Sequence, residues 1–359
     1  MSDTTTVNAK PVRTPKRDLV IDLIKAIAIL GVLVIHASTG ANAYPIGSFN
    51  WLSGNFYGCL TRASVPLFLM CSGALFLNTD KELPLKKLFL KSILRLVVAM
   101  LFWATMYKVY NLVETKNFTI TNLISDFKNV LFFNQEPHLY YIHITLLIYV
   151  LLPVLRVLVK NADKKTFLYA LGVWFALGVV YPTVIGFWPF NLITGIPLQW
   201  RLNLAYNAIG YFLLGHYLKK YPLKLLPSLI SAVLGFGLTY GMTVFMSIRN
   251  GSLYATFIDG MTLGVFFLGI GIYGLCHCAE GKIGKKLAGI TGYLSKASFC
   301  IYLVHMFILY EMGDLKLTVN LLPIPAIASV PMVTAVMLVI SLGVYFIISH
   351  IPVLKKWLV

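Results

Sequence analysis

Residues 17–39 read RDLVIDLIKAIAILGVLVIHAST, and this stretch decides how the rest of the chain is interpreted. It is long and apolar enough to cross a bilayer, since about 20 apolar residues suffice. Asp22, Lys25 and His36 nevertheless lie inside it. An ionisable side chain in hydrocarbon is costly unless the protein supplies a cavity or a partner. The stretch therefore predicts a transmembrane helix with a functional role.

Lys25 and His36 are eleven residues apart, which is three helical turns plus about 20°, so both side chains are predicted to project from one face. Their separation along the helix axis is about 16 Å at about 1.5 Å per residue. The spacing places a basic group near one membrane surface and an imidazole well towards the other. The alternative for His36 is a core histidine that is hydrogen-bonded to a neighbouring carbonyl.

The overall composition predicts an all-α, polytopic helical membrane protein, because the chain of 359 residues is 58% hydrophobic and 12% charged with a mean hydropathy of +0.79. We expect residues 1–17 to form a disordered basic cytoplasmic tail, residues 18–352 a single transmembrane domain, and residues 353–359 a short cytoplasmic tail. The five cysteines fall mostly within apolar runs, which argues against a disulfide framework.

Ten apolar runs predict about ten transmembrane helices. They cover residues 19–39, 55–77, 88–113, 138–160, 166–188, 201–219, 223–247, 254–277, 293–313 and 327–350. With the N-terminus inside, nineteen basic residues fall in inner segments: Lys10, Arg13, Lys16, Arg17, Lys81, Lys86, Lys87, Arg156, Lys160, Lys164, Lys165, Lys219, Lys220, Lys224, Lys282, Lys285, Lys286, Lys355 and Lys356. Only Lys116, Lys128, Arg249 and Lys316 fall in outer loops. The positive-inside rule thus predicts that both termini are cytoplasmic. Because this bias explains the net charge of +17, we expect no nucleic-acid binding.

Two segments of the chain allow further interpretations. The first apolar run ends at Ala41-Asn42-Ala43 and also resembles a secretory signal with a small-residue cleavage site, although Lys25 inside the run counts against that interpretation. The outer connection 114–137 contains FTITNLISDFKNVLFF, whose spacing predicts an amphipathic helix lying flat on the membrane surface.

The second apolar run contains Arg62, with Pro66 four residues later. A proline ring clashes with the carbonyl four residues back, so we expect the backbone to bend at Arg62 and to expose an acceptor. In the proposed topology Arg62 lies at the depth of His36, and both side chains are predicted to line one cavity. The alternative for Arg62 is a side chain that snorkels to the outer headgroups.

Four blocks of the sequence resemble the acyltransferase 3 family of integral-membrane acyltransferases. They are Lys25-x10-His36, where the family has arginine in the first position, RASVPLFLMCSGALF at 62–76, HLYY at 138–141 and SFCIYLVH at 298–305. The blocks occur in the family's order and spacing, and the resemblance covers essentially the whole chain. It is greatest to the short, single-domain members.

The resemblance implies that an acyl group, usually acetyl, passes from cytoplasmic acetyl-CoA to a sugar hydroxyl across a bacterial cytoplasmic membrane. We expect no bound cofactor; the partners are acetyl-CoA, a glycan or lipid-linked sugar acceptor, and membrane lipids. His36 is predicted to be the base, Arg62 to stabilise the oxyanion or to hold the acceptor, and Lys25 to meet the CoA phosphates or the thioester. Lysine offers a point charge where arginine would make bidentate contacts.

Other polar residues are candidates for substrate binding. Ser298, Tyr302 and His305 share one helical face by their spacing, and His138 matches a family block; a structural hydrogen-bonding stripe is the alternative for the first three. Arg201 is a candidate acceptor contact or an ordinary interface anchor. We expect no metal site, since Cys276-His277-Cys278 lacks a second ligand pair.

The rival function from another class is a transporter or flippase that binds an anionic or lipid-linked substrate through Lys25, His36 and Arg62. Acetyl transfer from acetyl-CoA distinguishes the two, because a flippase lacks it.

Overall fold

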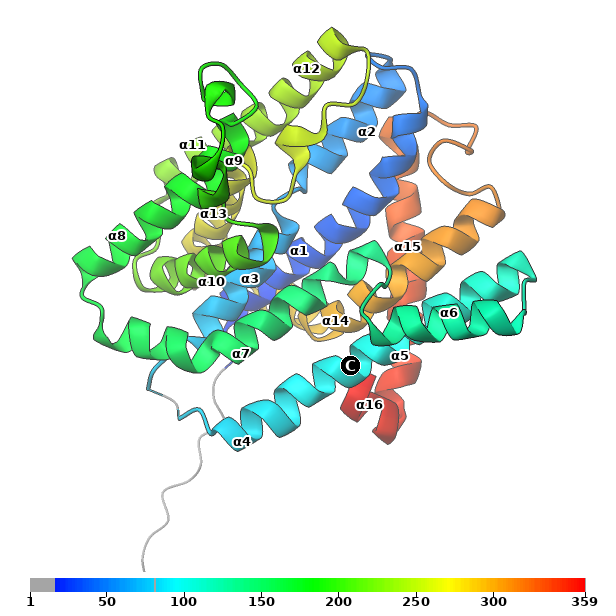
Figure 1. The fold of residues 1–359 in the computed structure, drawn as a ribbon, viewed down its shortest axis with the longest axis horizontal. Coiled ribbons are helices and arrows are strands. Elements are labelled where there is room, and N and C mark those ends of the chain that lie inside the picture. The colour runs from blue at the N-terminus through cyan, green and yellow to red at the C-terminus, as the bar shows by residue number, and fades with distance from the viewer. Residues whose placement is uncertain (1–16, 81, 359) are drawn as a thin grey trace, which may run out of the picture.

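The computed structural model describes residues 17–80 and 82–358, which are helical with no strand among them. The predicted basic tail lies outside these residues apart from Arg17. The helices form one bundle, in which the start of α1 and the C-terminal α16 lie towards the same end (Figure 1). The prediction of an all-α, polytopic membrane protein is confirmed. The side of the membrane that each end faces stays a prediction.

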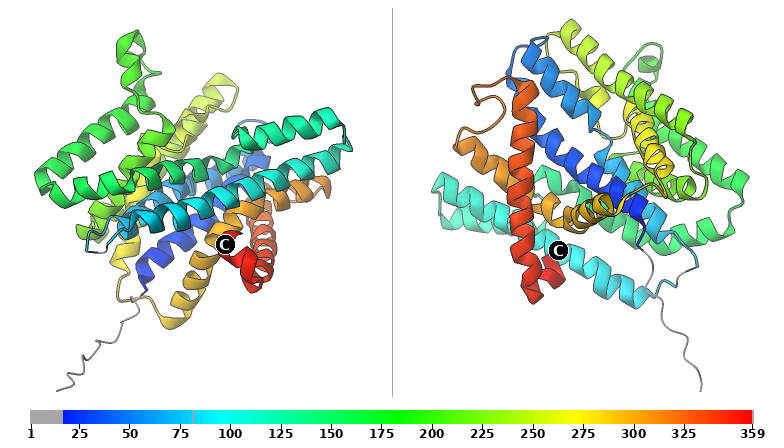
Figure 2. Two further views of the ribbon diagram at one scale, coloured as in Figure 1. Left: turned by 60° about the horizontal axis from the view of Figure 1, so that its bottom comes forward. Right: turned by 180° about the vertical axis from the view of Figure 1, so that it is seen from behind.

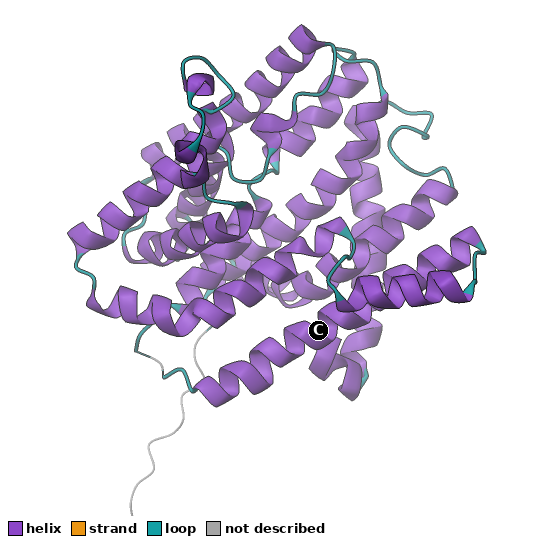
Figure 3. Cartoon of the chain, viewed as in Figure 1, coloured by secondary structure: helices purple, strands orange, loops and turns teal. Residues whose placement is uncertain are grey.

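The helices have the following bounds. They are α1 Leu19–Ser38, α2 Phe49–Leu60, α3 Ser64–Phe76, α4 Leu85–Lys87, α5 Leu94–Thr115, α6 Ile120–Leu131, α7 Tyr140–Asn161, α8 Lys164–Trp174, α9 Tyr181–Val184, α10 Leu204–Lys220, α11 Leu225–Phe236, α12 Met242–Asn250, α13 Leu263–Cys278, α14 Lys285–Asp314, α15 Ala326–His350 and α16 Pro352–Leu358. The π-helical segments are η2 Leu88–Ile93, η4 Phe175–Val180 and η7 Gly237–Gly241. The 3-10 turns include η3 Pro137–Leu139, η6 Ile196–Trp200 and η8 Ala255–Ile258. In the described residues these helices are joined by loops and turns, and no strand lies between them (Figure 3).

The described part of the chain has nine helical segments long and apolar enough to cross a membrane. Each of the nine overlaps one predicted run. The segment 49–76 starts earlier than the run predicted from 55, and the segment 164–184 ends earlier than the run predicted to 188. The predicted run 201–219 forms α10, whose 17 residues lie at the lower limit of what a span requires. Helix α14 begins at Lys285 rather than at 293, because its first two turns are too polar to register as an apolar run.

Helix α1 lies at the centre of the bundle, in contact with α2, α3, α14 and α15 (Figures 1 and 2). Ile24, Ala28, Ile29 and Leu33 are fully buried, so the helix has apolar neighbours on most of its surface. The close packing of such side chains against their neighbours fixes the position of the helix in the interior. The first apolar run is therefore an integral part of the folded domain.

Gly31 sets how closely α1 approaches the second apolar run. A Cβ atom at this position would collide with the Ser64 hydroxyl and press against Thr61. Glycine thus lets the two backbones meet, as small residues do at helix crossings in membranes. The close approach brings the second half of α1, which carries His36, beside the residues that separate α2 from α3.

Helix α6 has the amphipathic character predicted for the outer connection. Ile120, Ile124, Phe127 and Leu131 are exposed at helical spacing, so one apolar face points away from the bundle. The helix lies alongside the end of α5, with which it forms an arm at the edge of the molecule (Figure 2). The predicted amphipathic helix is confirmed, and its placement flat on a membrane stays a prediction.

Candidate active site

A cavity of about 920 Å³ runs beside α1 and is the site around which the predicted residues gather. Its lining comes from α1 and the turn after it, the α2–α3 break and α3, the α4–η2–α5 helix, η3 and α7, the start of α10, the segment after η8, α14 and α16. Lys25 and His36 both line it. The interior of the bundle therefore supplies the enclosed space that ionisable side chains in a membrane helix require.

Six basic side chains line one part of this cavity, which we call the cationic end. They are Lys25, Lys87, Lys91, Arg95, Lys296 and Lys356. All come from segments at the end of the bundle where α1 and α4 begin and the chain reaches α16 (Figure 1). Trp357 lines the cavity beside them. A concentration of positive charge in a half-enclosed space attracts phosphate-bearing ligands.

The other part of the cavity, which we call the histidine end, is lined by His36, Arg62, His138, Asp259 and Tyr302. Asp259 is the one acidic side chain among the described lining residues. Neither ring nitrogen of His138 has a hydrogen-bond partner among the residues that the structure describes. The imidazoles can act as bases, and the other side chains include cationic and neutral hydrogen-bond donors. Acyl transfer requires both kinds of group.

Arg62 lies in the break between α2 and α3 rather than in a bent continuous helix. Helix α2 ends at Leu60 and α3 starts at Ser64, and Pro66 lies in the first turn of α3, where a missing N–H is tolerated. The predicted disturbance of the backbone at Arg62 is present, and it takes the form of a three-residue break between two helices. The Arg62 guanidinium donates through Nε to the carbonyl of Ile258, so the 3-10 turn before α13 holds the side chain at the cavity.

The three residues predicted to share one face of α14 lie in two different surroundings. Two of them line the cavity, and the third lies in the interior behind it. Ser298 and Tyr302 line the cavity; the Ser298 hydroxyl donates to the Ser295 carbonyl at 2.9 Å, and the Tyr302 hydroxyl donates to the His138 carbonyl. His305 is fully buried and is not among the lining residues. Its ring centroid lies 4.8 Å from that of His36 and 5.4 Å from that of His138.

Two other predicted features lie away from the cavity. Arg201 follows η6 and is exposed in the connection before α10, and it does not line the cavity. Cys276, His277 and Cys278 end α13. In the described part of the chain no three histidine, cysteine or acidic side chains are placed to hold a metal ion.

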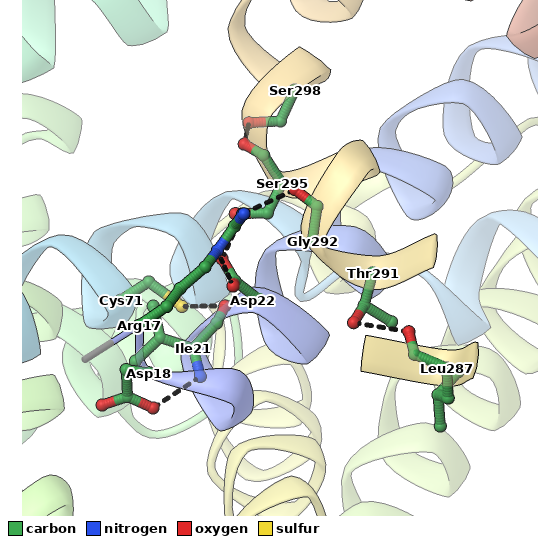
Figure 4. Close-up of polar contacts among 10 residues, drawn as sticks. All are labelled: Arg17, Asp18, Ile21, Asp22, Cys71, Leu287, Thr291, Gly292, Ser295 and Ser298. Carbon is green, nitrogen blue, oxygen red and sulfur yellow. Dashed lines mark hydrogen bonds and ion pairs between the residues drawn. The ribbon is translucent and has the colours of Figure 1, made fainter. Parts of the chain in front are cut away.

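The start of α1 is fixed to α14 at the cationic end. The Arg17 guanidinium pairs with the Asp22 carboxylate and donates to the Gly292 carbonyl at 2.5 Å (Figure 4). Asp22 is buried, so the ion pair supplies the partner that its charge needs. Asp18 caps α1 and pairs with Lys219 of α10 at 2.8 Å. These contacts hold Lys25 at a defined position in the cavity wall.

Comparison with family models matches residues 18–349 to the acyltransferase domain that defines the acyltransferase 3 family. The chain belongs to the acyltransferase 3 family. The match spans α1 to α15, and with it every lining residue except those of α16. No curated protein and no solved structure matched the chain in the other two comparisons. The protein is thus a membrane acyltransferase, and its cavity is the site at which acyl transfer is to be sought.

Several lining residues of this acyltransferase were not predicted from the sequence. Lys87, Lys91 and Arg95 recur every four residues, so they share one helical face. Lys91 and Arg95 are ionisable groups inside the third apolar run, and by the criterion applied to Lys25 they were detectable. Lys356 and Trp357 carried no signal of this kind, because a basic pair after the last span is typical of an inner tail.

Proposed function

We propose that the protein is an O-acetyltransferase of a bacterial cytoplasmic membrane. It would take the acetyl group from cytoplasmic acetyl-CoA and transfer it to a hydroxyl of a sugar or cell-surface glycan on the outer side. The observation that carries the proposal is one cavity with a cationic end and a histidine end. For the reaction we take as a guide the short, single-domain members of the family, such as the enterobacterial common antigen O-acetyltransferase, whose sequence blocks the chain resembles.

The charge of the cationic end supports coenzyme A as the donor. The phosphate groups of coenzyme A would pair with Lys87, Lys91, Arg95 and Lys356, and its adenine offers a face on which Trp357 can stack. Lys25 and His36 are separated by about 16 Å along α1, a distance that an extended pantetheine arm is suited to bridge. The thioester would then lie near His36.

The chemistry assigned to the histidine end is direct acyl transfer. His36 takes the proton of the acceptor hydroxyl while the hydroxyl oxygen forms a bond to the thioester carbonyl carbon. Arg62 stabilises the oxyanion that develops on the carbonyl oxygen. The carbon–sulfur bond then breaks, and the thiolate of coenzyme A receives the proton from His36. No further cofactor is required.

The acceptor would reach His36 from the opposite side of the membrane. Asp259 is exposed, lines the cavity and follows the turn that binds Arg62, so its carboxylate is available to accept hydrogen bonds from sugar hydroxyls. Arg201 would contact a longer glycan outside the cavity. A lipid-linked acceptor would in addition be held by the surrounding membrane lipids.

The experiment uses sealed vesicles of known orientation with acetyl-CoA labelled in its acetyl and adenine moieties. We expect acetyl-CoA to be consumed only on the cytoplasmic face and acetylated acceptor to appear only on the other, while adenine label stays behind. A panel of glycan acceptors identifies the substrate. Product on the donor's side, or adenine label that crosses the membrane, would contradict the proposed path, and glycan movement without acetyl transfer would identify a flippase.

A further inference from the structure

His305 differs from the other histidines of the site because it lies behind the cavity wall. Its side chain is fully buried, and its Nδ1 lies 2.7 Å from the Tyr302 carbonyl oxygen. A carbonyl can only accept a hydrogen bond, so Nδ1 carries the proton and the neutral ring presents an unprotonated Nε2. This Nε2 is buried with no hydrogen-bond partner. A buried polar atom without a partner is costly, and in a native structure it asks for an explanation.

The nearest ring to His305 is the imidazole of His36. Their centroids are 4.8 Å apart, and the ring planes are inclined by 55°. A hydrogen bond between two imidazoles places their centroids about 5 Å apart, since the nitrogens are about 3 Å from each other and about 1 Å from each ring centre. The observed separation therefore fits such a bond, which requires the His36 ring to turn a nitrogen towards Nε2. His36 itself lines the cavity.

We propose that His305 is a positioning residue for His36. Its Nε2 accepts the N–H of His36, which fixes the tautomer of His36 and turns the other ring nitrogen, with its lone pair, towards the cavity. The inference rests on the proposed function, in which His36 is the base. When His36 takes the proton of the acceptor hydroxyl, the same hydrogen bond stabilises the imidazolium that forms, as the third member of a hydrolase triad does. His305 itself gains and loses no proton.

Two conservative variants separate this role from a structural one. Glutamine places its amide oxygen near the position of Nε2, whereas asparagine places its amide N–H near that of Nδ1. His305→Gln therefore keeps an acceptor for His36, and His305→Asn keeps only the donor to the Tyr302 carbonyl. We expect His305→Asn to lower kcat about 10²-fold with an unchanged KM for acetyl-CoA, and His305→Gln to recover most of the loss. If His305 merely braces its own helix, the order of the two variants is reversed, and that result would overturn the proposal.

A second measurement needs no substrate. Diethyl pyrocarbonate modifies unprotonated imidazoles, and mass spectrometry of the digested protein gives the rate for each histidine. His350 is exposed at the end of α15 and serves as the internal reference. We expect His305→Asn to slow the modification of His36 several-fold relative to His350, and His305→Gln to leave it near the wild-type rate. Equal rates in all three proteins would contradict the pairing, whereas normal pairing in a protein without acetyl transfer would count against the proposed function alone. Thermal unfolding of both variants confirms that they are folded.

Discussion

Replacing Lys91 and Arg95 together by glutamine tests whether the cationic end of the cavity binds the donor. The two residues are one turn apart in the helix that joins η2 to α5, and both line the cavity. Lys91 is exposed, whereas Arg95 is half-buried. We expect the KM for acetyl-CoA to rise with little change in kcat, because neither side chain belongs to the histidine end where bonds are made and broken.

The size of the effect follows from the exposure of the two side chains. An exposed charge such as Lys91 contributes about 0.5 kcal/mol to binding a phosphate, since water screens it. A half-buried guanidinium such as Arg95 contributes about 1.5 kcal/mol through a charge-assisted hydrogen bond. The double variant should therefore lose about 2 kcal/mol, which is about 30-fold in KM. Added salt should raise the wild-type KM and narrow the difference, because the screening length falls to about 3 Å at 1 M.

The assay is the initial rate of acetyl transfer in permeabilised vesicles over a range of acetyl-CoA and salt concentrations. The matched control is Lys160→Gln with Lys165→Gln, which removes the same charge from two exposed positions of α7 and α8 outside the cavity. If KM rose equally in the control, the effect would come from the overall charge of the protein and not from the cavity. A fall in kcat at constant KM in the test variant would refute the assignment of the cationic end to the donor.

Substitutions at three positions of α1 provide further tests. His36→Gln should abolish transfer and leave the thermal midpoint near wild type, because a cavity-lining imidazole contributes little to packing; substantial remaining turnover would exclude His36 as the base. Lys25→Arg should retain activity and Lys25→Met should chiefly raise the KM for acetyl-CoA, whereas a Met variant that behaves like wild type would make Lys25 an interfacial anchor. Asp22→Asn should lower stability by about 1–2 kcal/mol, because it leaves the half-exposed Arg17 without its ion pair; a denaturation midpoint equal to wild type would show that the pair contributes nothing.

The central helix and its two cavity-lining side chains were predictable because the evidence for them is local. A run of apolar residues long enough to cross a bilayer needs no tertiary information, and neither does the spacing of Lys25 and His36 around one helix. The same reasoning covered the amphipathic α6, whose apolar residues recur at helical spacing. Local patterns of this kind depend on chain geometry alone, so predictions made from them do not depend on how the neighbouring helices pack.

The break at Arg62 shows where local reasoning stops. Pro66 indicates a disturbance, but a bent helix and two separate helices both accommodate a proline. The choice depends on groups far away in the sequence: Gly31 lets α1 press against Thr61 and Ser64, and the Ile258 carbonyl takes a hydrogen bond from the Arg62 guanidinium. Neither partner is visible from residues 55–77.

The division of α14 between cavity and interior has the same origin. Ser298, Tyr302 and His305 share a face by spacing, yet that face is wide enough for Tyr302 to meet the cavity while His305 points behind it. The rotation of α14 is set by its long contact with α1. A sequence pattern reports which residues lie together on a helix, and only packing decides which of them meets the ligand and which meets another side chain.

The cost of burying charge explains why basic side chains from several helices line the same cavity. Basic groups within apolar runs are expensive unless water, a partner or a ligand reaches them, and in the described residues Lys25, Arg62, Lys91 and Arg95 all line the same cavity. One enclosed space therefore accommodates these four cations together. Asp22, by contrast, is neutralised by Arg17 and is absent from the lining. A buried charge that has an acidic partner serves the fold, whereas the cations that line the cavity are placed to meet a substrate that brings negative charge with it.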